Sequence, residues 1–302
     1  MQSLRDIRRR IKSINSTRQI ARAMEMVSAA RLKRAQERLL SARPYADGVE
    51  AIVKRVCSRS DGIAHPFLFE REKKSIGICI VASDRGLCGA YNVNVIREAE
   101  RLARETARSA TAAAREETDA PGGKIMEVRF LPVGRKAFRH FRRKERTPLC
   151  SITELGASPD RRLASRFAGQ LINLYMEGKL DEIWIVFTSF ISAGSRRVTA
   201  SKLLPLELDE SESAAEGREY IYEPQAQELL QTLLPKYVAT KVFTTFAESC
   251  ASEHSARMVA MSFATKNADD MVDALTLLAN RARQSSITRE IADIVGTAEV
   301  LR

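Results

Sequence analysis

Hydrophobic residues near the N-terminus repeat at alternating spacings of three and four, the heptad pattern of a long helix that packs along a partner helix. Polar residues interrupt this register between residues 18 and 28, where Ile20, Met24 and Val27 carry the apolar face. The pattern predicts a sideways slip of the stripe there, and Pro44 predicts a kink or a short break. We expect one helix within residues 1–60, ~84 Å long if continuous. The regular positions are Leu4, Ile7, Ile11 and Ile14, then Leu32, Ala35, Leu39, Ala42, Ala46, Val49, Val53 and Val56.

The last segment, residues 209–302, is predicted to be an acidic linker followed by a second long helix after Pro235. From 236 to 301 this helix would span ~100 Å. Many of its repeat positions are Ala, Ser or Thr, so it can approach a partner closely but buries little apolar area. Such a coil should need an outer partner. The repeat positions are Ala247, Ala251, His254, Met258, Met261, Thr265, Ala268, Val272, Leu275, Ala279 and Ala282, followed by a second phase at Ile287, Ile291, Ile294, Ala298 and Leu301.

The middle of the chain, residues 70–208, alternates between strand and helix patterns. Short β-branched runs at 76–82, 125–133, 182–190 and 198–208 predict strands. Helical patterns begin at about Asn92 and cover 134–144 and 161–176, whereas 108–124 reads as a loop insertion. This alternation predicts a Rossmann-like α/β domain with a mostly parallel sheet.

Charge and composition narrow the class of protein. The chain has 302 residues and a net charge of +11, which calls for an acidic partner. No apolar run reaches the roughly 20 residues of a membrane span, and no apolar segment follows the basic N-terminus as in a secretory signal. The five cysteines and three histidines are widely spaced. We therefore expect no disulfide framework, no metal and no cofactor.

The turn 83–89 (SDRGLCG) lies between a predicted strand and a helix, where α/β proteins bind phosphate. The turn matches neither GxGxxG nor GxxxxGK[ST], so only its position in the chain favours nucleotide binding. We expect a tight turn at Ser83, Asp84, Arg85 and Gly86 in which Asp84 and Arg85 make structural polar contacts.

Basic and aromatic residues alternate over 135–144 (RKAFRHFRRK), a composition that also suits single-stranded nucleic acid. Phe138 and Phe141 are three positions apart and would face one side of a helix, which favours core anchoring with a solvated basic face. No Ser/His/Asp or Cys/His set has local support. We therefore predict a protein without a catalytic site.

Several stretches together resemble the gamma subunit of rotary F-type ATP synthases. They are 252–261 (SEHSARMVAM), 264–268 (ATKNA) and 280–291 (NRARQSSITREI), with 23–27 (AMEMV), 33–36 (KRAQ), 43–45 (RPY) and the turn 83–89. The resemblance implies an antiparallel coiled coil of the terminal helices inside a ring of alpha and beta subunits. It also implies an α/β domain that meets the epsilon subunit and the membrane c-ring. The chain would be a non-catalytic rotor shaft, without nucleic acid, peripheral to the bacterial inner membrane on its cytoplasmic side.

The same resemblance assigns residues that couple rotation to the beta subunits. Arg283 and Gln284 match positions that touch a beta loop, and Thr288, Glu290 and Met24 match further coupling positions. Alternatively, these residues form an exposed polar helix face without a role in coupling.

Two other classes stay open at this stage. A basic coiled-coil nucleic-acid-binding protein would explain the charge, and a small-molecule enzyme would need nucleotide binding at the turn. The chain also departs from the family pattern over 295–301, where Glu299 places a charge near the shaft tip. Such departures permit a second gamma paralogue.

Overall fold

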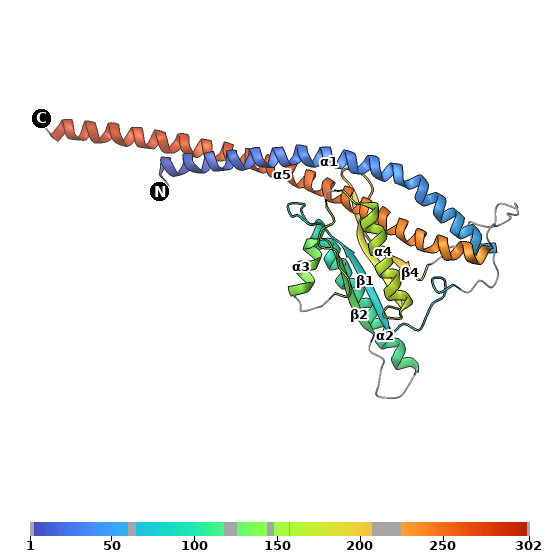
Figure 1. Ribbon diagram of the computed structural model, residues 1–302. Helices are drawn as coiled ribbons and strands as arrows, with labels where there is room; N and C mark the ends of the chain where they lie inside the picture. The colour runs from blue at the N-terminus through green and yellow to red at the C-terminus, as the bar shows by residue number, and fades with distance from the viewer. Residues whose placement is uncertain are drawn as a thin grey trace. The chain divides into compact units, whose positions relative to one another are not determined.

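The computed structural model describes residues 3–59, 65–117, 126–143, 148–156, 158–206 and 225–300 (Figure 1). These residues form two compact units. The helix-end unit comprises Met1–Ala29 and Arg257–Arg302, and the sheet unit comprises Ala30–Ala256. The predicted acidic linker at 209–224 and the second part of the predicted insertion, 118–124, lie outside the described residues.

Two long helices begin and end the described chain. Helix α1 covers Leu4–Arg59 and helix α5 covers Ala226–Val300, with 56 and 75 residues. A break at Pro44, one of the two predicted outcomes, is wrong because this proline lies inside α1, whereas the kink stays a prediction. Helix α5 likewise begins before Pro235 rather than after it. A proline inside a helix costs about 3 kcal/mol, and burial of residues on both sides of Pro44, such as Leu39 and Val53, offsets that cost.

The heptad register of α1 continues without the predicted slip. Ile20 and Val27 are 60% and 51% exposed, so neither carries the packed face. Ala21 and Ser28 are buried, at the positions that an uninterrupted register from Ile14 to Leu32 requires. The prediction is wrong because it chose the residues of the packed face by their hydrophobicity rather than by their spacing. In this stretch, small or polar residues fill the packed positions.

The two long helices run antiparallel. In the helix-end unit, Arg18 on α1 pairs with Asp269 on α5 at 2.6 Å. In the sheet unit, Glu50 on α1 and Tyr237 on α5 line one pocket. Positions therefore rise along α1 as they fall along α5, which confirms the predicted antiparallel coil.

The central sheet has four strands in the order β2-β1-β3-β4. They are β1 (Ser75–Val81), β2 (Glu127–Val133), β3 (Glu182–Phe190) and β4 (Arg196–Leu204). Strand β1 pairs in parallel with β2 and β3, whereas β4 is antiparallel to β3. The mostly parallel sheet is confirmed. Every residue of β1 is buried, which explains why its sequence is an unbroken apolar run rather than an alternation.

Three shorter helices complete the sheet unit: α2 (Tyr91–Glu117), α3 (Arg135–Arg143) and α4 (Arg161–Met176). The loop predicted to start at residue 108 is wrong in its first part, because α2 continues to Glu117. Its Ala- and Arg-rich sequence there favours a helix. Asp160 caps α4 by accepting a hydrogen bond from the backbone N–H of Arg162.

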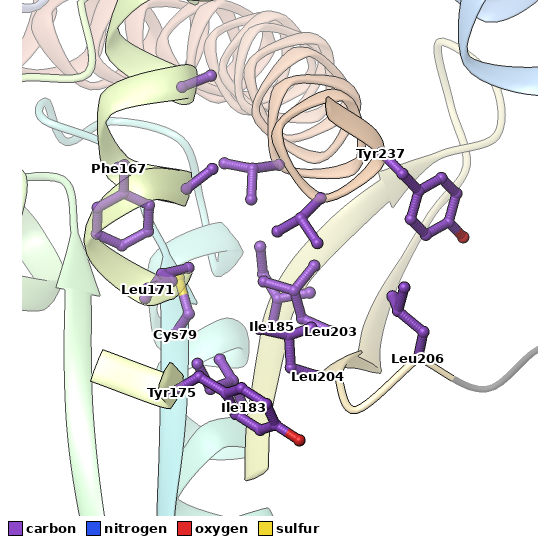
Figure 2. Packing of buried hydrophobic residues seen from close by; sticks show 14 of the residues in the cluster. Cys79, Phe167, Leu171, Tyr175, Ile183, Ile185, Leu203, Leu204, Leu206 and Tyr237 are labelled. Atoms are coloured by element: carbon purple, nitrogen blue, oxygen red, sulfur yellow. The ribbon is translucent and has the colours of Figure 1, made fainter. Parts of the chain in front are cut away.

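Each face of the sheet has its own hydrophobic core. On one face, side chains of α4 and α5 pack over the strands (Figure 2), and Val49, Val53 and Val56 of α1 join the same cluster. On the other face, α2 contributes Val95 and α3 contributes Phe141. The core of the sheet unit thus draws on the first, middle and last parts of the chain.

Candidate functional site

The turn after β1 is held by its own hydrogen bonds. The backbone N–H of Ser83 donates to Asn92 Oδ1 at 2.9 Å, and the Ser83 hydroxyl also reaches the Arg85 carbonyl at 2.5 Å. Leu87 adopts a positive φ of 63°. These contacts close the loop upon the first turn of α2.

Asp84 joins the turn to two distant segments. Its carboxylate accepts hydrogen bonds from the backbone N–H groups of Arg135 at 3.0 Å, Leu155 at 2.9 Å and Gly156 at 3.0 Å. A carboxylate in this place would repel a phosphate bound at the turn. The geometry therefore gives Asp84 a structural role.

The neighbouring glycine is required by close packing. Gly134 has a φ of +91°, and a Cβ there would lie 2.1 Å from the Ala82 carbonyl oxygen. Arg85 contributes only its backbone carbonyl to the turn, and its side chain is exposed. Sequence reasoning had expected polar contacts from this side chain as well.

The basic segment 135–143 forms α3, anchored by its aromatic residues. Phe141 is buried and stacks on Phe130 with ring centroids 4.4 Å apart, and Phe138 is half-buried. His140 Nε2 lies 2.9 Å from a carboxylate oxygen of Glu100. The arginines of α3 point away from this core and stay exposed, at Arg135, Arg139, Arg142 and Arg143.

The residues predicted to couple to beta subunits lie in the helix-end unit. Arg283 and Gln284 are exposed, and within the described chain their side chains make no hydrogen bond or ion pair. The Thr288 hydroxyl donates to the Gln284 carbonyl at 3.0 Å, and Glu290 accepts from the Ser286 hydroxyl at 3.2 Å. Met24 on α1 is half-buried. The side chains of Arg283 and Gln284, which have no partner among the described residues, are available to another chain.

No catalytic constellation appears among the described residues. One pocket of about 260 Å³ is lined mainly by cationic and small side chains, without a carboxylate or histidine that could act as a general base. No group of three His, Cys, Asp or Glu side chains in the described ranges could hold a metal ion. The pocket residues include Arg31, Arg34, Arg38, Ser158, Ala247 and Cys250.

A family model described as ATP synthase matches residues 3–301. The ATP synthase gamma chain of Desulfitobacterium hafniense is 42% identical over 301 residues, covering 100% of both chains. This chain belongs to the ATP synthase gamma-chain family. It is therefore a non-catalytic subunit with the role of a rotor shaft, in a complex that associates peripherally with a membrane. No described helix has the length and apolar composition needed to span a bilayer.

Solved structures agree with the gamma-chain fold. The central stalk and c-ring structure of the Tetrahymena thermophila mitochondrial ATP synthase contains a chain that matches at 25% identity, with a TM-score of 0.54, over 81% of this chain and 99% of that one. A chain of the Euglena gracilis mitochondrial ATP synthase matches with a TM-score of 0.64 and 18% identity, over 99% of this chain and 94% of that one. The second match supports the fold alone.

Sequence reasoning missed the polar contacts that hold α5 to the sheet unit. Tyr91, the first residue of α2, places its hydroxyl 2.5 Å from the Ser249 hydroxyl. These residues are 158 positions apart. No local pattern signals such a pair.

Proposed function

We propose that this gamma chain turns inside a ring of alpha and beta subunits, with the helix-end unit as the shaft within the ring. The sheet unit would meet the epsilon subunit and the c-ring. The full-length identity to gamma chains carries this proposal. Differential contacts of an asymmetric shaft would then shift each beta subunit in turn among states of different nucleotide affinity.

The apolar surface of the helix-end unit supports an outer partner. Ile287, Ile291 and Ile294 on α5 are 49%, 56% and 67% exposed, and Phe263 is 63% exposed. Ile287, Ile291 and Ile294 follow one another at spacings of one helical turn, and contiguous apolar side chains mark interaction surfaces in proteins. A surrounding ring of subunits would cover them.

Coupling to the beta subunits is assigned to Arg283, Gln284, Thr288, Glu290 and Met24. Their support is the matching family motif together with the exposure of the first four and the unpaired side chains of Arg283 and Gln284. The turn residues Ser83, Asp84, Arg85 and Gly86 are assigned to the structure of the α/β domain instead.

We propose that the protein is located on the cytoplasmic face of a bacterial plasma membrane. The bacterial relatives support it. The division of the chain into segments 1–60, 70–208 and 209–302 likewise stays a prediction, although the core under α4 draws side chains from all three.

The experiment is reconstitution of the full chain with alpha and beta subunits from the same organism. We expect a stable complex that hydrolyses ATP, and no turnover by the chain alone. Salt-dependent DNA binding by the purified chain, with no alpha or beta complex, would instead support the nucleic-acid-binding class. Loss of turnover on changing Asp84 in the chain alone would point to an enzyme.

A further inference from the structure

Helix α5 contacts the rest of the sheet unit in two chemically different ways. Over residues 230–246 the contacts are apolar, and Leu230, Leu234 and Val238 are fully buried in the core beneath α4 and α5. Over residues 248–255 the contacts become polar while the helix stays covered. Ser249 is 1% exposed and Ser255 is 0% exposed.

One polar contact comes from the start of α2. The Tyr91 hydroxyl lies 2.5 Å from the Ser249 hydroxyl and also donates to the Ser249 carbonyl at 3.1 Å. Burial raises the pKa of Tyr91 well above its usual range.

The other polar contacts come from β3, β4 and the loop between them. The Ser189 hydroxyl donates to Glu248 Oε2 at 2.6 Å. Two groups meet at Ser255: its hydroxyl donates to the Ala193 carbonyl at 2.6 Å and accepts from Arg196 Nη1 at 3.1 Å.

These contacts surround the helix on two sides. Residues 248 and 255 are two turns apart and share one side of α5, whereas residue 249 lies about 100° away around the axis. Apolar burial is non-directional and tolerates small rotations of a helix. Hydrogen bonds weaken steeply with angle, so turning α5 about its axis in either direction would strain at least one of them.

We propose that Tyr91, Ser189, Arg196, Glu248, Ser249 and Ser255 form a polar clamp that fixes the rotational register of α5 in the sheet unit. The clamp would transmit torque between that unit and the rest of α5. This inference rests on the proposed rotor function. Its members are positioning residues, because they hold the helix and touch no substrate.

The test uses the complete membrane-bound synthase that contains this gamma chain. Two quantities are measured in inverted vesicles: the rate of ATP hydrolysis and the rate of ATP-driven proton pumping. The variants are Tyr91→Phe, which removes a single oxygen, and the triple change Tyr91→Phe, Ser189→Ala and Ser255→Ala. The matched control is Tyr237→Phe, a buried tyrosine on the apolar stretch of α5 whose hydroxyl makes no hydrogen bond within the described residues.

We expect the number of protons pumped per ATP to fall by at least about twofold in Tyr91→Phe and further in the triple variant, since each hydrogen bond contributes about twofold to tenfold in an equilibrium. Hydrolysis should stay near wild type, and the control should keep the wild-type ratio.

An unchanged ratio in Tyr91→Phe overturns the clamp, as does a parallel fall of hydrolysis and pumping. If the triple variant does not assemble, Tyr91→Phe decides by the same ratio. A wild-type chain that fails to restore coupled pumping in a gamma-depleted synthase refutes the rotor function itself, which keeps the two failures distinct.

Discussion

The sheet unit and the helix-end unit are built from the same two long helices but bury side chains very differently. In the sheet unit, α5 presents large residues such as Leu234 and Phe246, both fully buried. In the helix-end unit, few α5 side chains are buried, among them Met261 and Ala268, and the isoleucines Ile287, Ile291 and Ile294 lie exposed. The comparison teaches that one helix can be a core element at one end and an interaction surface at the other.

The largest effect should come from the core of the sheet unit. Phe246 is 0% exposed, and its ring lies 6.0 Å from that of Phe167. Phe246→Ala should lower the free energy of unfolding by about 3–5 kcal/mol, because it removes apolar contacts and leaves a cavity. Urea unfolding of the isolated chain measures this. Ile291→Ala, at a 56% exposed site of the helix-end unit, should change the free energy of unfolding by less than about 0.5 kcal/mol. Equal losses of stability in Phe246→Ala and Ile291→Ala would show that the two units do not differ in burial.

A smaller loss of stability should follow from a substitution in the turn after β1. Asp84→Ala removes one carboxylate that accepts three backbone hydrogen bonds, so unfolding should become easier by about 2–3 kcal/mol. Thermal unfolding of the full chain measures the change. Arg85→Ala removes an exposed side chain and serves as the control with almost no effect. A wild-type melting temperature for Asp84→Ala would show that these hydrogen bonds do not stabilise the sheet unit.

Substitutions in the helix-end unit should change the rate of ATP hydrolysis by the complex rather than the stability of the chain. Changing both Arg283 and Gln284 to Ala should slow ATP hydrolysis by the reconstituted complex about tenfold to a hundredfold, if a charged hydrogen bond forms mainly in the rate-limiting state. Complex yield should stay normal, because assembly depends on the whole length of the helices. Normal turnover in a normally assembled complex would make these residues a solvated face, and loss of the complex would make them structural.

The smallest effect should come from the ion pair of the helix-end unit. Arg18 and Asp269 are 2.6 Å apart with side chains 37% and 49% exposed. A double-mutant cycle with Arg18→Ala and Asp269→Ala should give a coupling of about 0.2–1 kcal/mol that weakens at high salt. Circular dichroism melting measures it. A coupling that is larger and independent of salt would mean that this seam is more buried than the exposed fractions indicate.

Much of the fold follows from local patterns in the sequence. The predicted strand at 182–190 and helix at 161–176 have the observed bounds of β3 and α4. The heptad spacing also placed the packed side of α5, since Val272, Leu275, Ala279 and Ala282 are less exposed than their neighbours. The prediction failed between residues 18 and 28 of α1, where a conflict between spacing and hydrophobicity was decided in favour of hydrophobicity.

The coupling residues were predicted from a motif, and their assignment stays a prediction. The structure adds that the side chains of Arg283 and Gln284 make no hydrogen bond or ion pair within the described residues. The side chain of Glu299, the residue that departs from the family pattern, lies outside the described residues.

The periodic features were readable from the sequence alone: two long helices, an alternating central segment and, from composition, a basic N-terminus. These depend on spacings within one element, which local backbone geometry converts directly into a face or a strand. The contacts of Asp84 with Leu155 and of Tyr91 with Ser249, across separations of 71 and 158 residues, became visible only in the folded chain. Such contacts depend on how distant segments pack. A buried hydrogen bond between two of them produces no repeating pattern in the sequence.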